Sequence, residues 1–101
     1  MDISRFNNTG PVAIAKEAKA IRTGRSTIFS NRGDKVARQT AFLTSIASQQ
    51  PRMAALAADM FRRNPAGYAK AADVPESIIG MYAAIIETRL AVVTGDYHRA
   101  A

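Results

Sequence analysis

The chain has 101 residues, a mass of 10.9 kDa and a formal net charge of +6, and this length gives room for one small domain. Hydrophobic residues make up 48% and charged residues 22%, which excludes wholesale disorder. With no cysteine and one histidine, the chain cannot build a disulfide framework, a thiolate nucleophile or a cysteine-based zinc site. Aromatic residues are sparse at 7%, and frequent alanine favours closely packed helices over a sheet sandwich.

Composition and periodicity together predict an all-α protein, a small helical bundle of three to four helices with an extended N-terminal arm. We expect the arm to span residues 1–10 and a single helical domain to span 11–101. Within that domain, 11–33 would form a basic helix and loop, and 34–101 the helical core. Ile3 and Phe6 are isolated apolar residues in the arm. They either pack back onto the core or anchor the arm in a neighbouring subunit.

The first predicted helix begins near Pro11 and runs to Arg22 or Thr23, where Gly24 stops it. A narrow apolar stripe and a separate basic stripe follow its length; they consist of Ile14, Ala18 and Ile21, and of Lys16, Lys19 and Arg22. Because the apolar stripe is small, we expect this helix to be the least stable element by itself and to gain order from a partner.

Residues 23–33 read as a loop with a short β-prone centre between two glycines. We expect Ile28 and Phe29 to plug this loop into the core, while Arg25 and Arg32 face outward. The second helix then opens with Asp34 as N-cap and extends to about Gln49. Its predicted apolar face consists of Val36, Thr40, Leu43 and Ala47, flanked by Phe42 and Ile46.

A third helix should start at Pro51 and end at Arg62 and Arg63, whose charges complement the negative end of the helix dipole. Its apolar residues follow the helical period and are Met53, Leu56, Ala57, Met60 and Phe61. After it, Asn64 can cap one short extra turn that reaches Ala72, although Gly67 weakens it.

The last helix is predicted to be the longest and the centre of the domain. Asp73 caps it, Pro75 occupies its first turn, and Gly95 ends it. Its buried face should contain Ile78, Ile79, Tyr82, Ile85, Ile86, Leu90 and Val93. The most apolar stretch, 78–86, spans only about one-third to one-half of a bilayer at 1.5 Å per residue. With no signal-peptide pattern at the N-terminus, we expect a cytoplasmic or virion protein that is neither secreted nor membrane-spanning.

The positive charge is concentrated in the first half of the chain. Up to residue 52 there are nine cationic side chains against three carboxylates, and from residue 53 onward there are five of each. Such asymmetry favours one anionic partner surface, although a basic solvated face that keeps a small protein soluble would look the same. The candidate residues for contact with nucleic acid or another polyanion are Lys16, Lys19, Arg22, Arg25, Arg32, Lys35 and Arg38. Ile3, Phe6 and Phe29 are candidate anchors for a protein interface.

Enzymatic and metal-dependent functions find little support in the sequence. His98 follows the predicted end of the last helix, and the carboxylates fit capping and surface roles. Residues 23–27 superficially resemble a phosphate-binding loop but lack its strand and second glycine. A helix-turn-helix is disfavoured because Pro51 stands where a turn glycine would be natural. We therefore expect no catalytic residue, no metal and no cofactor.

The sequence predicts a non-enzymatic subunit of a larger assembly, of the virion or nucleoprotein type, with other protein subunits as partners in a homo- or hetero-oligomer. Its basic half would contact nucleic acid through phosphates or contact an acidic partner. The alternative is a small inhibitor or adaptor that docks on one acidic protein without nucleic acid, with Phe6 and Phe29 as anchors.

Overall fold

The computed structural model describes residues 3, 6 and 10–94. Over these residues it contains no strand and five α-helices, which are α1 (Pro11–Arg22), α2 (Lys35–Gln49), α3 (Pro51–Arg63), α4 (Pro65–Ala72) and α5 (Glu76–Thr94). The all-α class is confirmed. Five helices replace the expected three to four because the segment after Asn64 forms a full helix, which Asn64 caps by accepting a hydrogen bond from the backbone N–H of Gly67 at 3.1 Å. The predicted stop at Gly95 and the position of His98 lie outside the described residues.

The C-terminus of α1 and the N-terminus of α2 are capped by the residues that the sequence predicted, Gly24 and Asp34. Gly24 adopts a φ of 73°, and the N–H groups of Gly24 and Arg25 donate to the carbonyls of Ile21 and Ala20 at 3.2 and 2.7 Å. This pair of bonds is a Schellman closure, which needs a left-handed residue. Asp34 caps α2, since its carboxylate accepts from two N–H groups of the first turn at 2.9 and 3.3 Å.

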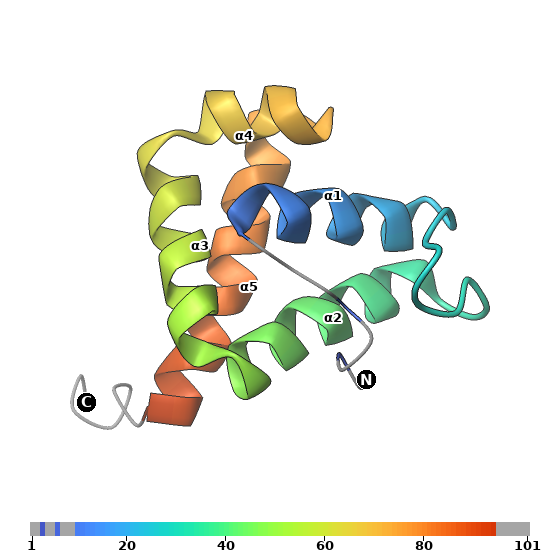
Figure 1. The fold of residues 1–101 in the computed structure, drawn as a ribbon, viewed down its shortest axis with the longest axis horizontal. Coiled ribbons are helices and arrows are strands. Elements are labelled where there is room, and N and C mark those ends of the chain that lie inside the picture. Colours follow the sequence, from blue (N-terminus) through green and yellow to red (C-terminus); the bar gives the residue numbers. More distant parts are fainter. Residues whose placement is uncertain (1–2, 4–5, 7–9, 95–101) are drawn as a thin grey trace.

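Figure 1 shows how the helices are arranged in space. α1 and α2 run in opposite directions and are joined by the loop of residues 23–34 at one end of the long axis, whereas α3, α4 and α5 gather toward the other end. α5 contacts α2, α3 and α4, and α1 contacts α2, α3 and α4. The charge asymmetry along the chain thus becomes an asymmetry in space, because the residues from Arg22 to Arg38 lie toward the loop end.

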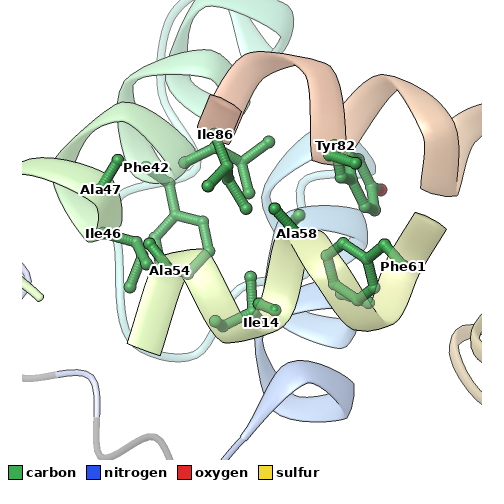
Figure 2. Packing of buried hydrophobic residues seen from close by; sticks show 14 of the residues in the cluster. Ile14, Phe42, Ile46, Ala47, Ala54, Ala58, Phe61, Tyr82 and Ile86 are labelled. Carbon is green, nitrogen blue, oxygen red and sulfur yellow. The ribbon is translucent and has the colours of Figure 1, made fainter. Parts of the chain in front are cut away.

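The core is formed where four helices meet. Figure 2 shows large apolar side chains converging from α1, α2, α3 and α5, among them Ile14, Phe42, Phe61, Tyr82 and Ile86. All five are at most 1% exposed. α5 therefore lies at the centre of the packing, as expected, with Ile79, Tyr82 and Ile86 buried.

α1 is packed more completely than its narrow apolar stripe suggested. Ile14, Ala15, Ala18 and Ile21 are at most 1% exposed, although only two of these four side chains are large. Alanine lets neighbouring backbones approach closely, so a helix with a small apolar stripe can still fit between three others. The apolar stripe of α1 is covered by the chain itself, and no partner is needed to cover it.

The N-terminal residues that the structure describes belong to the core and correct the prediction of an extended arm. Ile3 is 2% and Phe6 7% exposed, and the ring of Phe6 meets that of Phe42 edge-on with centroids 5.1 Å apart. Packing back onto the core is thus the arrangement observed. The physical reason is that two large apolar side chains leave water by filling the edge of their own core.

Two predicted helix faces are rotated in the structure. On α2, Val36 is 50% exposed and Thr40 is exposed, while Gln39 is buried in their place. The amide of Gln39 can be buried because it donates hydrogen bonds to the carbonyl of Ala18 and the hydroxyl of Tyr82, each at 3.1 Å. Side-chain hydrogen bonding, which periodicity does not measure, decided the orientation of this turn.

On α3, Leu56 was expected inside but is 53% exposed. The predicted Ala57 and Phe61 are buried, together with Ala54 and Ala58, which were not predicted, and the predicted Met53 and Met60 are half-buried. The small alanine side chains bring the backbone of α3 close to α1 and α5, which α3 contacts. Close helix approach therefore outweighed the burial of one large leucine.

α5 is rich in apolar residues on several sides but only partly covered by the described residues. Ile78, Ile85 and Leu90 are half-buried, and the predicted core residue Val93 is 42% exposed. By length and composition alone, this helix could also cross a membrane, a criterion that the core helix of a soluble protein equally meets.

Candidate anion-binding surface

The loop that carries the central cations is held in shape by a buried polar network. The hydroxyl of Ser26 donates to the carboxylate of Glu17 on α1 at 2.6 Å and accepts from the N–H groups of Ile28 and Phe29 at 3.2 and 2.9 Å. Asn31 closes the loop by binding the N–H and the carbonyl of Ser26, both at 3.1 Å. Because Glu17 and Ser26 are buried, these bonds fix the loop against α1.

Two of the predicted contact residues also brace this loop. The Nζ of Lys35 donates to the carbonyl of Asn31 at 3.3 Å, and its aliphatic chain lies so close to Gly24 that a Cβ there would come within 2.5 Å of it. The Nε of Arg38 donates to the carbonyl of Arg32. Both side chains thus have a structural role in addition to their charge.

Lys19 is neutralised within the chain. Its Nζ donates to the carboxylate of Asp73 at 3.0 Å and to the carbonyl of the same residue at 2.8 Å. Asp73 was expected to cap the last helix, but it ends α4 instead, in the left-handed conformation with φ 59°. This contact joins α1 to the turn between α4 and α5 and leaves Lys19 with little free charge.

The other four predicted cations keep their charge available. Lys16, Arg22, Arg25 and Arg32 are exposed, and none forms an ion pair with a carboxylate among residues 3, 6 and 10–94. In the same part of the chain, Glu17 is bound to Ser26 and Asp34 caps α2. Both carboxylates stay charged, but the cations of this region outnumber them, so the loop end keeps a net positive charge.

The second half of the chain is organised differently. Arg62 binds both oxygens of Glu87 at 2.7 and 3.1 Å, and Arg63 binds Asp59 one helical turn away at 3.1 Å. The hydrogen bond and charge of Glu87 raise the pKa of the Arg62 guanidinium above its usual value. Arg62 and Arg63 at the end of α3 are therefore paired with carboxylates, whereas Arg25 and Arg32 of the loop form no ion pair among the described residues.

A groove adjoins the cations of α1. It has a volume of about 620 Å³ and lies between α1, α2, α5 and the turn before α5. Its charged residues are Lys19, Arg22 and Asp73, and its apolar residues are Val36, Val74, Pro75, Ile78 and Met81.

The buried hydroxyl of Tyr82 accepts a hydrogen bond from Gln39, which lines the groove, and burial raises the pKa of this hydroxyl to about 12. Tyr82 therefore remains protonated at neutral pH and serves as a structural hydrogen-bonding group.

Phe29, the third candidate interface anchor, is half-buried and lies 5.6 Å from Phe42 between ring centroids. It holds the loop to α2, as does the half-buried Ile28 in the core cluster, so the predicted plug is confirmed. Together with the burial of Ile3 and Phe6, this leaves none of the three anchors as a free apolar side chain. Glu17, Ser26 and Gln39 were missed, because a lone polar residue in a helix or loop gives no periodic signal.

Comparisons with protein families, with curated proteins and with solved structures find no match to this chain. The function is therefore argued from the surface itself. Its exposed guanidinium groups can bind phosphate or carboxylate oxygens, in a bidentate way where the geometry allows.

Proposed function

We propose that this protein is a non-enzymatic component of a larger assembly, of the virion or nucleoprotein type, that contacts the phosphates of nucleic acid through the loop end. The observation that carries this proposal is the set of exposed cations that form no ion pair among the described residues, Lys16, Arg22, Arg25 and Arg32. Binding of this kind needs charge and reach without base reading.

The support of the loop strengthens the proposal. A mobile loop would lose conformational freedom on binding, which opposes association. Here the loop backbone is tied to α1 by Ser26 and to α2 by Lys35 and Arg38. Arg25 and Arg32 project from a fixed support, so less ordering remains to be done when phosphate binds.

The test is the salt dependence of binding to a generic DNA duplex, measured by fluorescence anisotropy. For about four phosphate contacts, the logarithm of the association constant should fall by about 3 to 4 per logarithmic unit of salt. The triple variant Arg22→Gln, Arg25→Gln, Arg32→Gln should reduce this slope by about 2 to 3. Binding that is undetectable at low ionic strength, or insensitive to salt, overturns the proposal.

A matched control removes the same charge elsewhere. Arg52, Arg63 and Lys70 are exposed cations of α3 and α4, and changing all three to Gln lowers the net charge by the same amount. If the loop end is the contact surface, this control keeps the salt slope of the parent protein. Equal losses in the two triple variants would mean that net charge alone drives binding.

The alternative is docking on one acidic protein partner. The observation that favours it is the groove beside Arg22, whose apolar walls suit a side chain better than a sugar–phosphate backbone. A partner recovered with the full-length chain after nuclease treatment, and lost with Val36→Glu in the groove, would favour this alternative. Loss of all partners on nuclease treatment favours nucleic acid.

A further inference from the structure

One face of α5 is only partly covered by residues 3, 6 and 10–94, and its own side chains carry no charge. Between its first and last turns, the side chains on this face are Ser77, Ile78, Met81, Ala84, Ile85, Thr88, Ala91 and Val92, of which Met81 is 37% and Val92 50% exposed. The only hydroxyl near the middle, that of Thr88, donates to the carbonyl of Ala84 at 2.8 Å and is thereby satisfied within the helix. Apolar side chains that gather on one partly covered face of a helix mark a candidate contact with another molecule.

The charged side chains at the two edges of this face are hydrogen-bonded to neighbouring helices. Glu87 is bound by Arg62 of α3, and the Nε of Arg89 donates to the hydroxyl of Ser48 on α2 at 2.9 Å. Neither side chain folds across α5. Shallow grooves flank the helix on the α2 side and the α3 side, with volumes of about 400 and 410 Å³.

The spacing of the apolar residues is that of a helix that pairs with a like helix. Ile78, Met81, Ile85, Thr88 and Val92 alternate steps of three and four residues, and the β-branched residues Ile78, Ile85 and Val92 recur every seventh position. Heptads with β-branched residues at their first position favour parallel pairs of helices. From Ile78 to Val92, these residues extend about 21 Å along the helix axis.

We propose that this face of α5 is the contact between two copies of the chain, related by a two-fold axis parallel to α5. The charges at the edges of the face fit a second copy in this arrangement. Two chains of net charge +6 repel each other, and the side chains of the face itself add no charge to that repulsion. The parallel axis brings the Glu87 edge of one copy against the Arg89 edge of the other, whereas an antiparallel pair would oppose like charges.

The groove on the α2 side of α5 enlarges the contact beyond a single pair of helices. It is lined by Thr40, Thr44, Ile85 and Arg89 among others. Side chains of the second copy that enter it add to the area that a stable interface requires, which is about 800 Å² per partner.

Sedimentation of the full-length protein over a range of concentrations tests this inference. We expect a species of twice 10.9 kDa that becomes more stable as salt rises, because salt screens the repulsion between the copies. The double variant Met81→Glu, Val92→Glu should weaken dimerisation at least about 100-fold, since it would bury unpaired charge. Both side chains are exposed in the single chain, so circular dichroism should remain that of the parent.

The control is Leu56→Glu, which places the same charge at an exposed apolar residue of α3 outside this face, and it should leave the dimer intact.

The chain contains no cysteine, so Thr88→Cys provides a single thiol whose disulfide would join two copies only in the parallel arrangement. A monomer at all concentrations, or a dimer unaffected by the double variant, overturns the inference. A dimer without the Thr88→Cys cross-link overturns the parallel arrangement. Salt should strengthen dimerisation but weaken binding of nucleic acid. The two proposals can therefore fail independently.

Discussion

The hydroxyl of Ser26 lies 2.6 Å from the carboxylate of Glu17, and both residues are buried. This contact spans the end of α1 and connects the helix to the loop that carries Arg25 and Arg32. The same oxygen accepts from two backbone N–H groups of the loop. One serine therefore determines how the exposed arginines are presented.

Ser26→Ala should destabilise the protein by about 1–3 kcal/mol, because it leaves the buried carboxylate and two N–H groups without their partner. Chemical denaturation measures this change, and amide exchange should become faster at Ile28 and Phe29. Thr27→Ala is the control, since Thr27 is an exposed neighbour in the same loop. Equal stability of the two variants would show that the network does not hold the loop.

Asp73 occupies a left-handed position that favours glycine. Asp73→Ala should lower the free energy of unfolding by about 1 kcal/mol or more, because the Cβ of alanine makes the left-handed backbone conformation unfavourable. Asp73→Gly should be at least as stable as the parent, although it also loses the contact with Lys19, because exposed ion pairs contribute little. Thermal unfolding of the two variants gives the comparison. A less stable glycine variant would assign the larger role to the ion pair.

Tyr82 should make stability depend on alkaline pH. Its pKa is about 12 in the folded chain and about 10 when unfolded. The unfolded state loses its proton first, so stability is full below pH 10 and falls as pH rises toward 12, by up to about 2–3 kcal/mol. Tyr82→Phe should remove this part of the pH dependence in denaturation experiments between pH 8 and 11. An unchanged slope in the variant would contradict the assignment.

The centre of the core lies at Ile86 rather than Ile85. Ile86 is fully buried and Ile85 half-buried, so Ile86→Ala should cost about 2–5 kcal/mol and Ile85→Ala clearly less. Leu56→Ala, on the exposed side of α3, should change stability by no more than about 0.5 kcal/mol. Denaturant midpoints would rank the three variants. A larger loss at Leu56 than at Ile86 would contradict the packing described here.

Much of the secondary structure could be predicted because its signals are local. Pro11, Gly24, Asp34, Pro51 and Asn64 mark helix ends through restricted φ angles, left-handed backbone or side-chain caps, and the structure uses each of them at a helix boundary. The concentration of cations before residue 53 could likewise be counted. What it implies about a partner stays a prediction, which the salt experiment tests.

The sequence by itself determined the all-α class, most of the helix boundaries and the charge asymmetry, since these depend on backbone preference and composition over a few residues. Only the tertiary structure decided that Gln39 is buried and Leu56 exposed, that Ile3 and Phe6 complete the core, and that Lys19 is paired while Arg22 forms no ion pair among the described residues. These outcomes depend on contacts between residues far apart in the chain, such as Lys19 with Asp73 or Gln39 with Tyr82. Helical periodicity gives the direction of a side chain relative to its own helix, but the neighbours that it meets are set by how five helices pack together.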